Sequence, residues 1–174
     1  MDNSNKRVIL TGFMGVGKSS VARHLSFMLR CEKIDLDYYV EETENRTVAE
    51  ILQTDGEAHF RQIETINLLK ILDSGARIIS LGGGTWTIEE NRKIIKNYDC
   101  TSIWLESDFE HCWRNIRMSN KERPLAKDKR RARKLFEERQ KFYCLADWHF
   151  IIKPEFTSFE VARRIAEEVF QTKF

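Results

Sequence analysis

The stretch Gly12-Phe-Met-Gly-Val-Gly-Lys-Ser19 decides the fold of this 174-residue chain. It satisfies the pattern G-x-x-x-x-G-K-[ST], follows the apolar run Val8–Thr11 and opens the amphipathic segment Lys18–Leu29. A strand, a glycine-rich turn and a helix in this order form a P-loop, which binds phosphate through backbone N–H groups and a helix N-terminus. The alternative is a glycine-rich turn with a chance lysine, and the flanking strand and helix argue against it. The sequence therefore predicts a nucleotide-binding α/β domain.

Each residue type in this stretch suits one part of a triphosphate. Glycines let the backbone curl so that successive N–H groups point at phosphate oxygens. We expect Lys18 to reach the β- and γ-phosphates of ATP and the Ser19 hydroxyl to bind Mg²⁺. The residues expected to contact the nucleotide here are Gly15, Val16, Gly17, Lys18, Ser19 and Ser20.

Short apolar runs alternate with longer amphipathic segments along the rest of the chain. Strands are predicted at Val8–Thr11, Lys33–Leu36, Ile78–Leu81, Ser102–Leu105 and His149–Ile152. Helices are predicted at Lys18–Leu29, Val48–Thr54, Glu57–Asp73, Glu89–Lys96, Asp108–Met118, Lys129–Ala146 and Phe159–Gln171. This alternation favours an α/β fold, with helices on both faces of a mostly parallel sheet. We expect one domain over residues 1–174, with its ligands beyond the carboxyl ends of the strands.

The composition argues against several classes of protein. With 29 basic and 27 acidic side chains the net charge is +2, which does not favour a nucleic-acid partner. No run approaches the roughly 18 apolar residues of a membrane span, and Met1–Arg7 lacks the apolar region of a signal peptide. The spacing of the four cysteines is typical of reduced thiols rather than of a disulfide or zinc framework. We therefore expect a cytoplasmic protein without a membrane partner, and a monomer.

Two carboxylates close the second predicted strand, in Asp35-Leu36-Asp37. Residues two apart on a strand face the same side, so both carboxylates should point toward the γ-phosphate. We expect Asp35 to hold Mg²⁺ through water and Asp37 to accept a hydrogen bond from an attacking hydroxyl, as base or positioning group. The alternative makes Asp37 the N-cap of a helix over Tyr38–Glu42 and leaves Asp35 a solvated strand end.

The third predicted strand, Ile78–Leu81, runs into the triplet Gly82-Gly83-Gly84. Glycines at the end of a strand let backbone N–H groups approach a ligand closely. The alternative is a loose turn, but ordering three glycines costs conformational entropy at each position. A ligand contact at this turn is therefore favoured.

Two arginines are predicted to face inward. Arg139 lies at the centre of the apolar stripe of the predicted helix Lys129–Ala146. A buried guanidinium needs a partner, which is either a protein carboxylate or an anionic substrate. Arg61 is also expected to face the interior from its predicted helix. The alternative is a local ion pair with Glu57 or Glu64.

A basic stretch follows the fourth strand and its helix. Arg117 to Lys134 contains nine basic and two acidic residues and includes Arg123-Pro-Leu-Ala. Such runs are usually solvated faces or polyanion patches. This run spans a gap between two predicted helices and has no interleaved aromatic residues, which favours a mobile lid over about residues 117–128. Such a lid would bring Arg123 onto the transferring phosphate.

These elements, in this order, resemble the shikimate kinases over nearly the whole chain. The matching pieces are GFMGVGKSS, the DLD strand end, DGEAHFRQIE, LGGG, ERPLA and ERQKFYCLAD. The resemblance implies a three-layer α/β/α fold of the nucleoside-monophosphate-kinase type with a five-stranded parallel sheet. It also implies transfer of the γ-phosphate of ATP to the 3-hydroxyl of shikimate, a step of chorismate and aromatic amino acid biosynthesis.

The resemblance further implies roles for residues of the acceptor site. Asp37 would contact the reacting shikimate hydroxyl. Arg61 and Arg139 would clamp the carboxylate, and the Gly83 amide would contact the substrate. Two alternatives remain open. The acceptor could be another hydroxy acid, such as gluconate, or a nucleoside monophosphate. The protein could also be a catalytically idle relative that only binds nucleotide.

On the nucleotide side the resemblance implies that Arg123 closes over the ATP phosphates and that Arg117 packs on the adenine. Three features depart from the family pattern. The lid reads RPLA where many relatives have RPLL, and residues 127–131 behind it are unusually basic. Residues 153–158 offer no arginine for the nucleobase, and Trp86 after the glycine triplet is bulky enough to alter the pocket wall.

Overall fold

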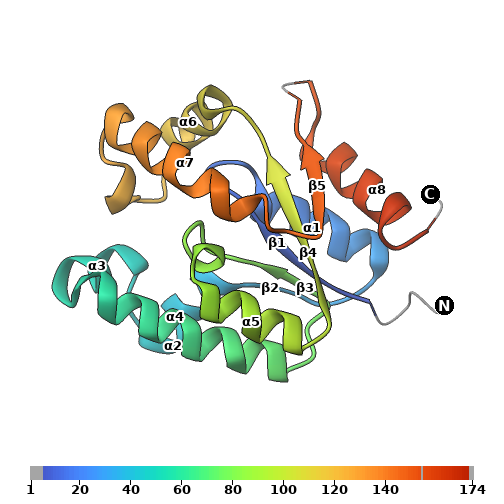
Figure 1. The fold of residues 1–174 in the computed structure, drawn as a ribbon, viewed down its shortest axis with the longest axis horizontal. Coiled ribbons are helices and arrows are strands. Elements are labelled where there is room, and N and C mark those ends of the chain that lie inside the picture. Colours follow the sequence, from blue (N-terminus) through green and yellow to red (C-terminus); the bar gives the residue numbers. More distant parts are fainter. Residues whose placement is uncertain (1–5, 154, 173–174) are drawn as a thin grey trace.

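Five parallel strands form one sheet in the computed structural model, which describes residues 6–153 and 155–172 (Figure 1). The strands are β1 (Arg7–Thr11), β2 (Lys33–Asp35), β3 (Ile78–Ser80), β4 (Cys100–Glu106) and β5 (Trp148–Ile151). Their order is β2-β3-β1-β4-β5, so β1 lies at the centre. Because all the pairs are parallel, the carboxyl ends of the five strands lie at one edge of the sheet.

Helices cover both faces of the sheet, as the α/β prediction requires. The helices are α1 (Lys18–Leu29), α2 (Leu36–Glu44), α3 (Val48–Thr54), α4 (Gly56–Asp73), α5 (Glu89–Asn97), α6 (Phe109–Met118), α7 (Lys129–Tyr143) and α8 (Ser158–Glu168), with short 3₁₀ helices η2 (Thr85–Thr87) and η3 (Pro124–Ala126). In Figure 1, α1 and α8 pack together on one face, and α4 and α5 lie side by side on the other. The apolar run of β1 is enclosed between these layers, and Val8, Ile9 and Leu10 are completely buried.

Most predicted elements are confirmed, with shifted ends. All five predicted strands form, and α1 and α3 begin and end at the predicted residues. Helix α7 ends at Tyr143 rather than Ala146, because the amides of Leu145 and Ala146 donate three residues back, to the carbonyls of Phe142 and Tyr143. The two 3₁₀ helices were not predicted.

The predicted end of the second strand at Leu36 is wrong. Strand β2 ends at Asp35, and α2 begins at the next residue. The Asp35 carboxylate accepts a hydrogen bond from the amide of Tyr38 at 3.3 Å, so Asp35 is the N-cap of α2. Asp37 therefore lies in the first turn of a helix. The alternative that placed Asp37 at the N-cap is also wrong, by two residues.

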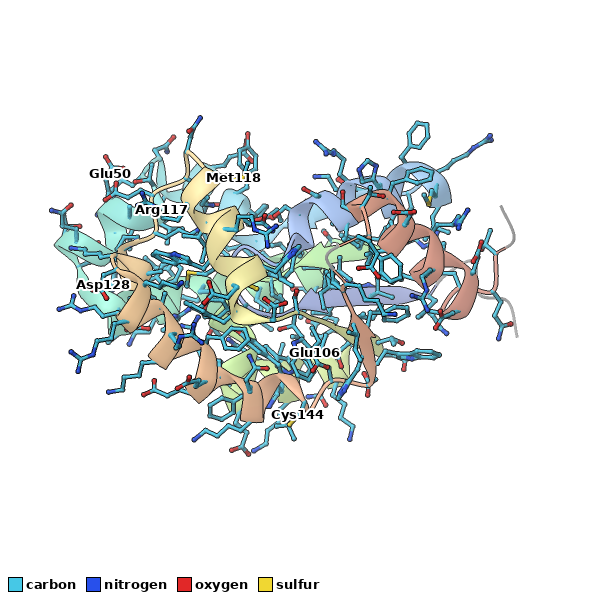
Figure 2. All side chains as sticks on the ribbon, turned by 90° about the horizontal axis from the view of Figure 1, so that it is seen from above. Glu50, Glu106, Arg117, Met118, Asp128 and Cys144 are labelled. Atoms are coloured by element: carbon cyan, nitrogen blue, oxygen red, sulfur yellow. The ribbon has the colours of Figure 1, made fainter. Side chains whose placement is uncertain are left out.

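The predicted lid region joins α6 to α7 across one end of the molecule. In Figure 2 the chain passes from Met118 to Asp128 beside α3, where Glu50 lies. Within this segment η3 contacts both α3 and α7, and Ala126 is buried. The Asp128 carboxylate accepts a hydrogen bond from the Arg131 amide at 2.9 Å and caps α7. The structure thus places this segment against the body of the protein, and its mobility stays a prediction.

Candidate active site

A cavity of about 470 Å³ lies around the P-loop, beyond the carboxyl ends of the strands. All six predicted nucleotide contacts from Gly15 to Ser20 line it. Residues that follow the other strands complete the wall: Asp35, Asp37, Leu81, Gly83, His111, Asn115, Ser119, Lys121, Arg123, Ile152, Phe156, Ser158 and Val161. Every strand of the sheet therefore leads into this cavity.

The P-loop adopts the curled backbone that its glycines predict. Gly15 has φ 80°, and a Cβ at this position would collide with the carbonyl oxygen of Cys112. The side chain of Asn115 on α6 donates to the Gly15 carbonyl at 2.7 Å, which ties α6 to the loop. Gly17 has φ 104° and is the N-cap of α1. Both positions exclude most residues with side chains.

Lys18 is buried beneath the loop. Its ammonium group donates to the carbonyls of Gly12 at 2.8 Å and Phe13 at 3.1 Å. Burial, helped by the nearby Arg123 guanidinium, lowers the pKa of Lys18 to about 8. The ammonium therefore lies in a low-dielectric site where an anionic phosphate would stabilise its charge.

Asp35 and Asp37 both reach the nucleotide cavity, although not by strand alternation. The Ser19 hydroxyl donates to the Asp35 carboxylate, which joins the start of α1 to the end of β2. Burial raises the pKa of Asp37, and the positive charges of Lys121 and Lys18 oppose that rise. The prediction of a shared acidic site is confirmed, and its geometric reason is corrected.

A second, smaller cavity of about 70 Å³ adjoins the first and holds the predicted acceptor residues. Two groups of side chains line it. One group also lines the nucleotide cavity, namely Met14, Asp37, Gly83, Lys121 and Arg123. The other lines the second cavity alone, namely Val48, Leu52, Phe60, Arg61, Glu64, Gly82, Gly84, Glu122, Pro124, Leu125 and Arg139. The two cavities therefore meet at Asp37 and Arg123.

Arg61 lines this second cavity while it is paired with two acids of its own helix. Its guanidinium donates to Glu64 at 2.9 Å and to Glu57 at 3.0 Å. Glu64 is 1% exposed and also accepts from the Thr85 hydroxyl at 2.6 Å. Burial raises the pKa of Glu64, and the charge of Arg61 opposes the rise. The local pairing offered as an alternative is thus present, and three of the five guanidinium N–H groups remain for a ligand.

The glycine triplet lets the backbone pass between charged side chains. A Cβ on Gly82 would lie 2.5 Å from Asp37 Oδ1 and 2.9 Å from Glu64 Oε1, and one on Gly84 would collide with the Arg61 guanidinium. Gly83 offers more room, since its Cβ would lie 3.4 Å from Arg139 Nη1. Side chains at Gly82 and Gly84 would displace the acids and the arginine. The triplet thus allows close packing against these side chains, and the ligand contact at this turn stays a prediction.

Arg139 faces inward, as its helical position predicts. It is 6% exposed and lies beside Tyr143, whose hydroxyl donates to the Gly83 carbonyl. Burial raises the pKa of Tyr143 to about 12. Across residues 6–153 and 155–172, no carboxylate forms a salt bridge with Arg139. Its guanidinium can therefore receive an anion.

Arg123 points from the lid segment into the junction of the two cavities. In the described part of the chain its buried Nε has no hydrogen-bond partner. Burial lowers the pKa of Arg123, and the carboxylates of Asp37 and Asp35 oppose this. An unpartnered guanidinium donor in a buried position is costly unless a ligand meets it.

Two sequence expectations concern residues that the structure places elsewhere. Arg117 is exposed near the end of α6 and is not among the residues that line the nucleotide cavity (Figure 2). Its contact with adenine stays a prediction. Trp86 is buried and donates through Nε1 to the Phe142 carbonyl at 3.0 Å. It does not line the acceptor cavity, so the expected change in the pocket wall is wrong.

Several residues that line the cavities were not predicted from the sequence. His111 and Asn115 lie on α6, and their helix carries no motif that marks them. Phe156 follows the last strand, in a segment noted only for its lack of arginine. Lys121 was visible only as one charge of the basic stretch. Contact across elements, rather than local pattern, brings these residues to the site.

None of the helices in the described residues is both long and apolar enough to span a membrane. The described residues contain no cluster of three or more His, Cys, Asp or Glu side chains suited to a metal ion. The four cysteines all lie in the described part of the chain, and none forms a disulfide.

A P-loop beside an acidic pair, an adjoining cavity with two arginines, and Arg123 on the segment between α6 and α7 define a P-loop small-molecule kinase. A family model described as shikimate kinase matches residues 14–170. The chain belongs to the shikimate kinase family and is an ATP-dependent kinase.

Individual relatives agree with this assignment. A shikimate kinase of Ruegeria pomeroyi is 34% identical over 146 residues, covering 82% of this chain and 74% of the relative. A shikimate kinase of Persephonella marina is 34% identical over 143 residues, covering 82% of this chain and 86% of the relative. The solved shikimate kinase from Acinetobacter baumannii in complex with shikimate superposes with a TM-score of 0.88 at 26% identity, covering 95% of this chain and 93% of that one.

Proposed function

We propose that this protein transfers the γ-phosphate of ATP to the 3-hydroxyl of shikimate, giving ADP and 3-phosphoshikimate. One observation carries the proposal: the nucleotide cavity and a cavity lined by Arg61 and Arg139 meet at Asp37 and Arg123. This arrangement supports a path from a phosphoryl donor, past an acidic group for the hydroxyl, to cations for a carboxylate.

On the donor side, we propose that the P-loop amides and Lys18 bind the phosphates. Lys18 now donates to two carbonyls, and phosphate oxygens would replace them as acceptors. The Ser19 hydroxyl and the Asp35 carboxylate supply oxygen ligands of the kind that Mg²⁺ prefers, with Asp35 acting through water. When bound, Mg²⁺ neutralises charge on the phosphates.

On the acceptor side, Asp37 is proposed to accept the proton of the reacting hydroxyl, or to orient that hydroxyl for attack. Burial raises the pKa of this carboxylate, and a base is more effective as its pKa nears the working pH. Asp37 lies where the two cavities meet, so a hydroxyl held beside it faces the end of the triphosphate. Geometry and basicity therefore support the same role.

The carboxylate of shikimate is proposed to lie against Arg61, Arg139 and the amide of Gly83. Arg139 has no carboxylate partner in the described residues, and Arg61 keeps free donors beside its two acids. A guanidinium matches a planar carboxylate with two parallel hydrogen bonds. Glu64 holds Arg61 in place from its buried side.

Lid movement is proposed to admit the acceptor and then to exclude water. The acceptor cavity of about 70 Å³ is small, and an outward shift of the lid would widen it for a cyclic acid. On closure Arg123 would reach the transferring phosphate. Water exclusion prevents ATP hydrolysis from competing with transfer. We further propose a cytoplasmic monomer.

The test is release of ADP that depends on shikimate. Purified protein with MgATP is assayed with shikimate, with gluconate, with a nucleoside monophosphate and without any acceptor. We expect turnover with shikimate at least roughly 100-fold above the other acceptors, since the ring of shikimate holds its carboxylate rigidly relative to its reacting hydroxyl, whereas gluconate is flexible and a nucleoside monophosphate carries a phosphate instead. Equal rates with and without shikimate would refute the proposed substrate, and ATP binding without turnover would indicate an idle relative.

A further inference from the structure

Lys121 belongs to the lid segment and has no role in the scheme above. It lies two residues before Arg123, and its side chain is 39% exposed. Five residues line both cavities, and two of them, Lys121 and Arg123, carry a positive charge. Both cations therefore lie where the two cavities meet.

Two carboxylates of α2 hold the Lys121 ammonium group without a hydrogen bond. The Nζ atom lies 3.9 Å from Asp37 Oδ2 and 3.8 Å from Glu41 Oε1. These distances suit an ion pair and exceed the roughly 3.2 Å of a hydrogen bond. Asp37 and Glu41 are four residues apart, so one face of α2 presents both. The three N–H donors of the ammonium are thus still available for other oxygens.

Glu41 is a fixed anchor for this contact. Its Oε1 accepts a hydrogen bond from the Val48 amide at 3.1 Å, at the first residue of α3. The same oxygen therefore faces both α3 and the Lys121 ammonium group. This places the ammonium beside Asp37 rather than out in solvent.

The charges at the junction explain why a cation is needed there. Asp35, Asp37 and Glu41 present three carboxylates at this end of α2. An anionic phosphoryl group that approaches a hydroxyl held by Asp37 meets the repulsion of these acids. A cation between the carboxylates and the phosphoryl group reduces that repulsion when the transfer occurs.

We propose that Lys121 is a further catalytic residue, which binds the transferring phosphoryl group where the two cavities meet and shields it from Asp37 and Glu41. The proposal rests on the proposed function. Lys121 and Arg123 lie on one short segment, so a single closure of the lid delivers both cations. Arg123 offers a rigid fork of donors around its buried Nε, whereas Lys121 offers a compact point charge.

The test removes the charge of Lys121 and measures each kinetic constant. In Lys121→Gln we expect kcat for shikimate phosphorylation to fall about 10–100-fold, because a cation that stabilises the transferring group is lost. The KM values for ATP and shikimate should change less than about 3-fold, because the contact forms mainly during transfer. Lys121→Arg keeps the charge and should recover most of kcat.

The matched control is Lys127→Gln. Lys127 is an exposed lysine of the same segment that lines neither cavity, so its loss should leave both kcat and KM at wild-type values. Thermal unfolding of all variants checks that they are folded. If Lys121→Gln turns over like Lys127→Gln, or if Lys121→Arg is as slow as Lys121→Gln, the proposal is overturned.

The role of Glu41 gives a second readout. Glu41→Gln keeps an oxygen for the Val48 amide and removes the charge that anchors Lys121. We expect the change in kcat to be non-additive with that of Lys121→Gln, because the carboxylate that Lys121 is proposed to shield is absent from the double variant. Additive losses would overturn the link between the two residues. Wild-type protein that does not turn over shikimate would refute the proposed function, whereas active wild type with unaffected Lys121 variants would refute this inference alone.

Discussion

The donor and acceptor ends of the active site are built in different ways. The donor end is local: a single strand, turn and helix supply Gly15 to Ser20 from contiguous positions. The acceptor end is assembled from α2, α4, the turn after β3, the lid and α7. Asp37 and Arg139, which are proposed to act on one substrate, are far apart in sequence.

The charges at the two ends also differ. At the donor end, Lys18 is buried against neutral carbonyls, and its charge is costly until a phosphate is present. At the acceptor end, Arg61 already has acidic partners in Glu57 and Glu64. The donor end therefore holds a buried cation at the expense of stability, whereas the acceptor end pairs Arg61 with acids and leaves Arg139 without a carboxylate partner in the described residues. Point mutations at each end can test these differences separately.

The largest expected effect is at the point where the two ends meet. Asp37→Asn keeps the shape of the side chain and removes its basicity. We expect kcat to fall by about 10²–10⁴-fold, the range for loss of a general base, with ATP affinity little changed. Steady-state kinetics and a nucleotide-binding titration measure the two quantities. Near wild-type turnover would mean that another group accepts the proton.

The next effect isolates the donor end. Lys18→Met removes the charge beneath the P-loop and should lower kcat/KM for ATP by about 10²–10³-fold, as for loss of a donor to a developing anion. Binding of shikimate, followed by equilibrium titration, should stay within about 3-fold of wild type because Lys18 does not line the acceptor cavity. Loss of shikimate binding in this variant would contradict the separation of the two ends.

At the acceptor end, Arg139→Gln and Arg61→Gln should both weaken shikimate binding. Loss of a charged hydrogen-bonding group corresponds to about a 10–100-fold rise in KM for shikimate. Only Arg61→Gln should also destabilise the fold, by about 3 kcal/mol, because it leaves the buried Glu64 carboxylate without its cation. Denaturant unfolding of both variants distinguishes them. Equal destabilisation would show that Arg139 also has a structural partner.

A smaller effect concerns the dependence of stability on pH. The folded state lowers the pKa of Lys18 from 10.5 to about 8, so between these values the unfolded state binds more protons. The Lys18 contribution to stability therefore rises with pH across this window, by on the order of 3 kcal/mol in total. The difference in unfolding free energy between wild type and Lys18→Met should grow in favour of wild type from pH 8 to pH 10.5. A flat difference would mean that the lysine is not buried without a ligand.

The smallest effect tests the position of Trp86. Trp86→Phe removes the hydrogen bond to the Phe142 carbonyl and should cost about 1 kcal/mol of stability. The KM for shikimate should not change, because Trp86 lies outside the acceptor cavity. A raised KM with unchanged stability would place Trp86 in the pocket wall after all.

The two ends also differ in how well the sequence predicted them. The P-loop could be predicted from the sequence because its strand, its glycine-rich turn and its helix are contiguous in the chain. Arg139 was found because a helix turns every 3.6 residues and places it in an apolar stripe. The joint placement of Asp35 and Asp37 was predicted for the wrong reason, because strand alternation was assumed where an N-cap begins a helix. Lys121, His111 and Asn115 were missed, since no local pattern marks a residue whose role depends on a distant element.

By itself, the sequence determined the class of fold, the phosphate cradle and the inward direction of Arg139, because these follow from periodicity and backbone chemistry within one element. The tertiary structure decided that Asp37 and Arg123 join two cavities. It also decided that Lys121 lies against two carboxylates of α2. Such contacts join elements far apart in the chain, and only the packing of the whole domain brings their side chains within a few ångströms of each other.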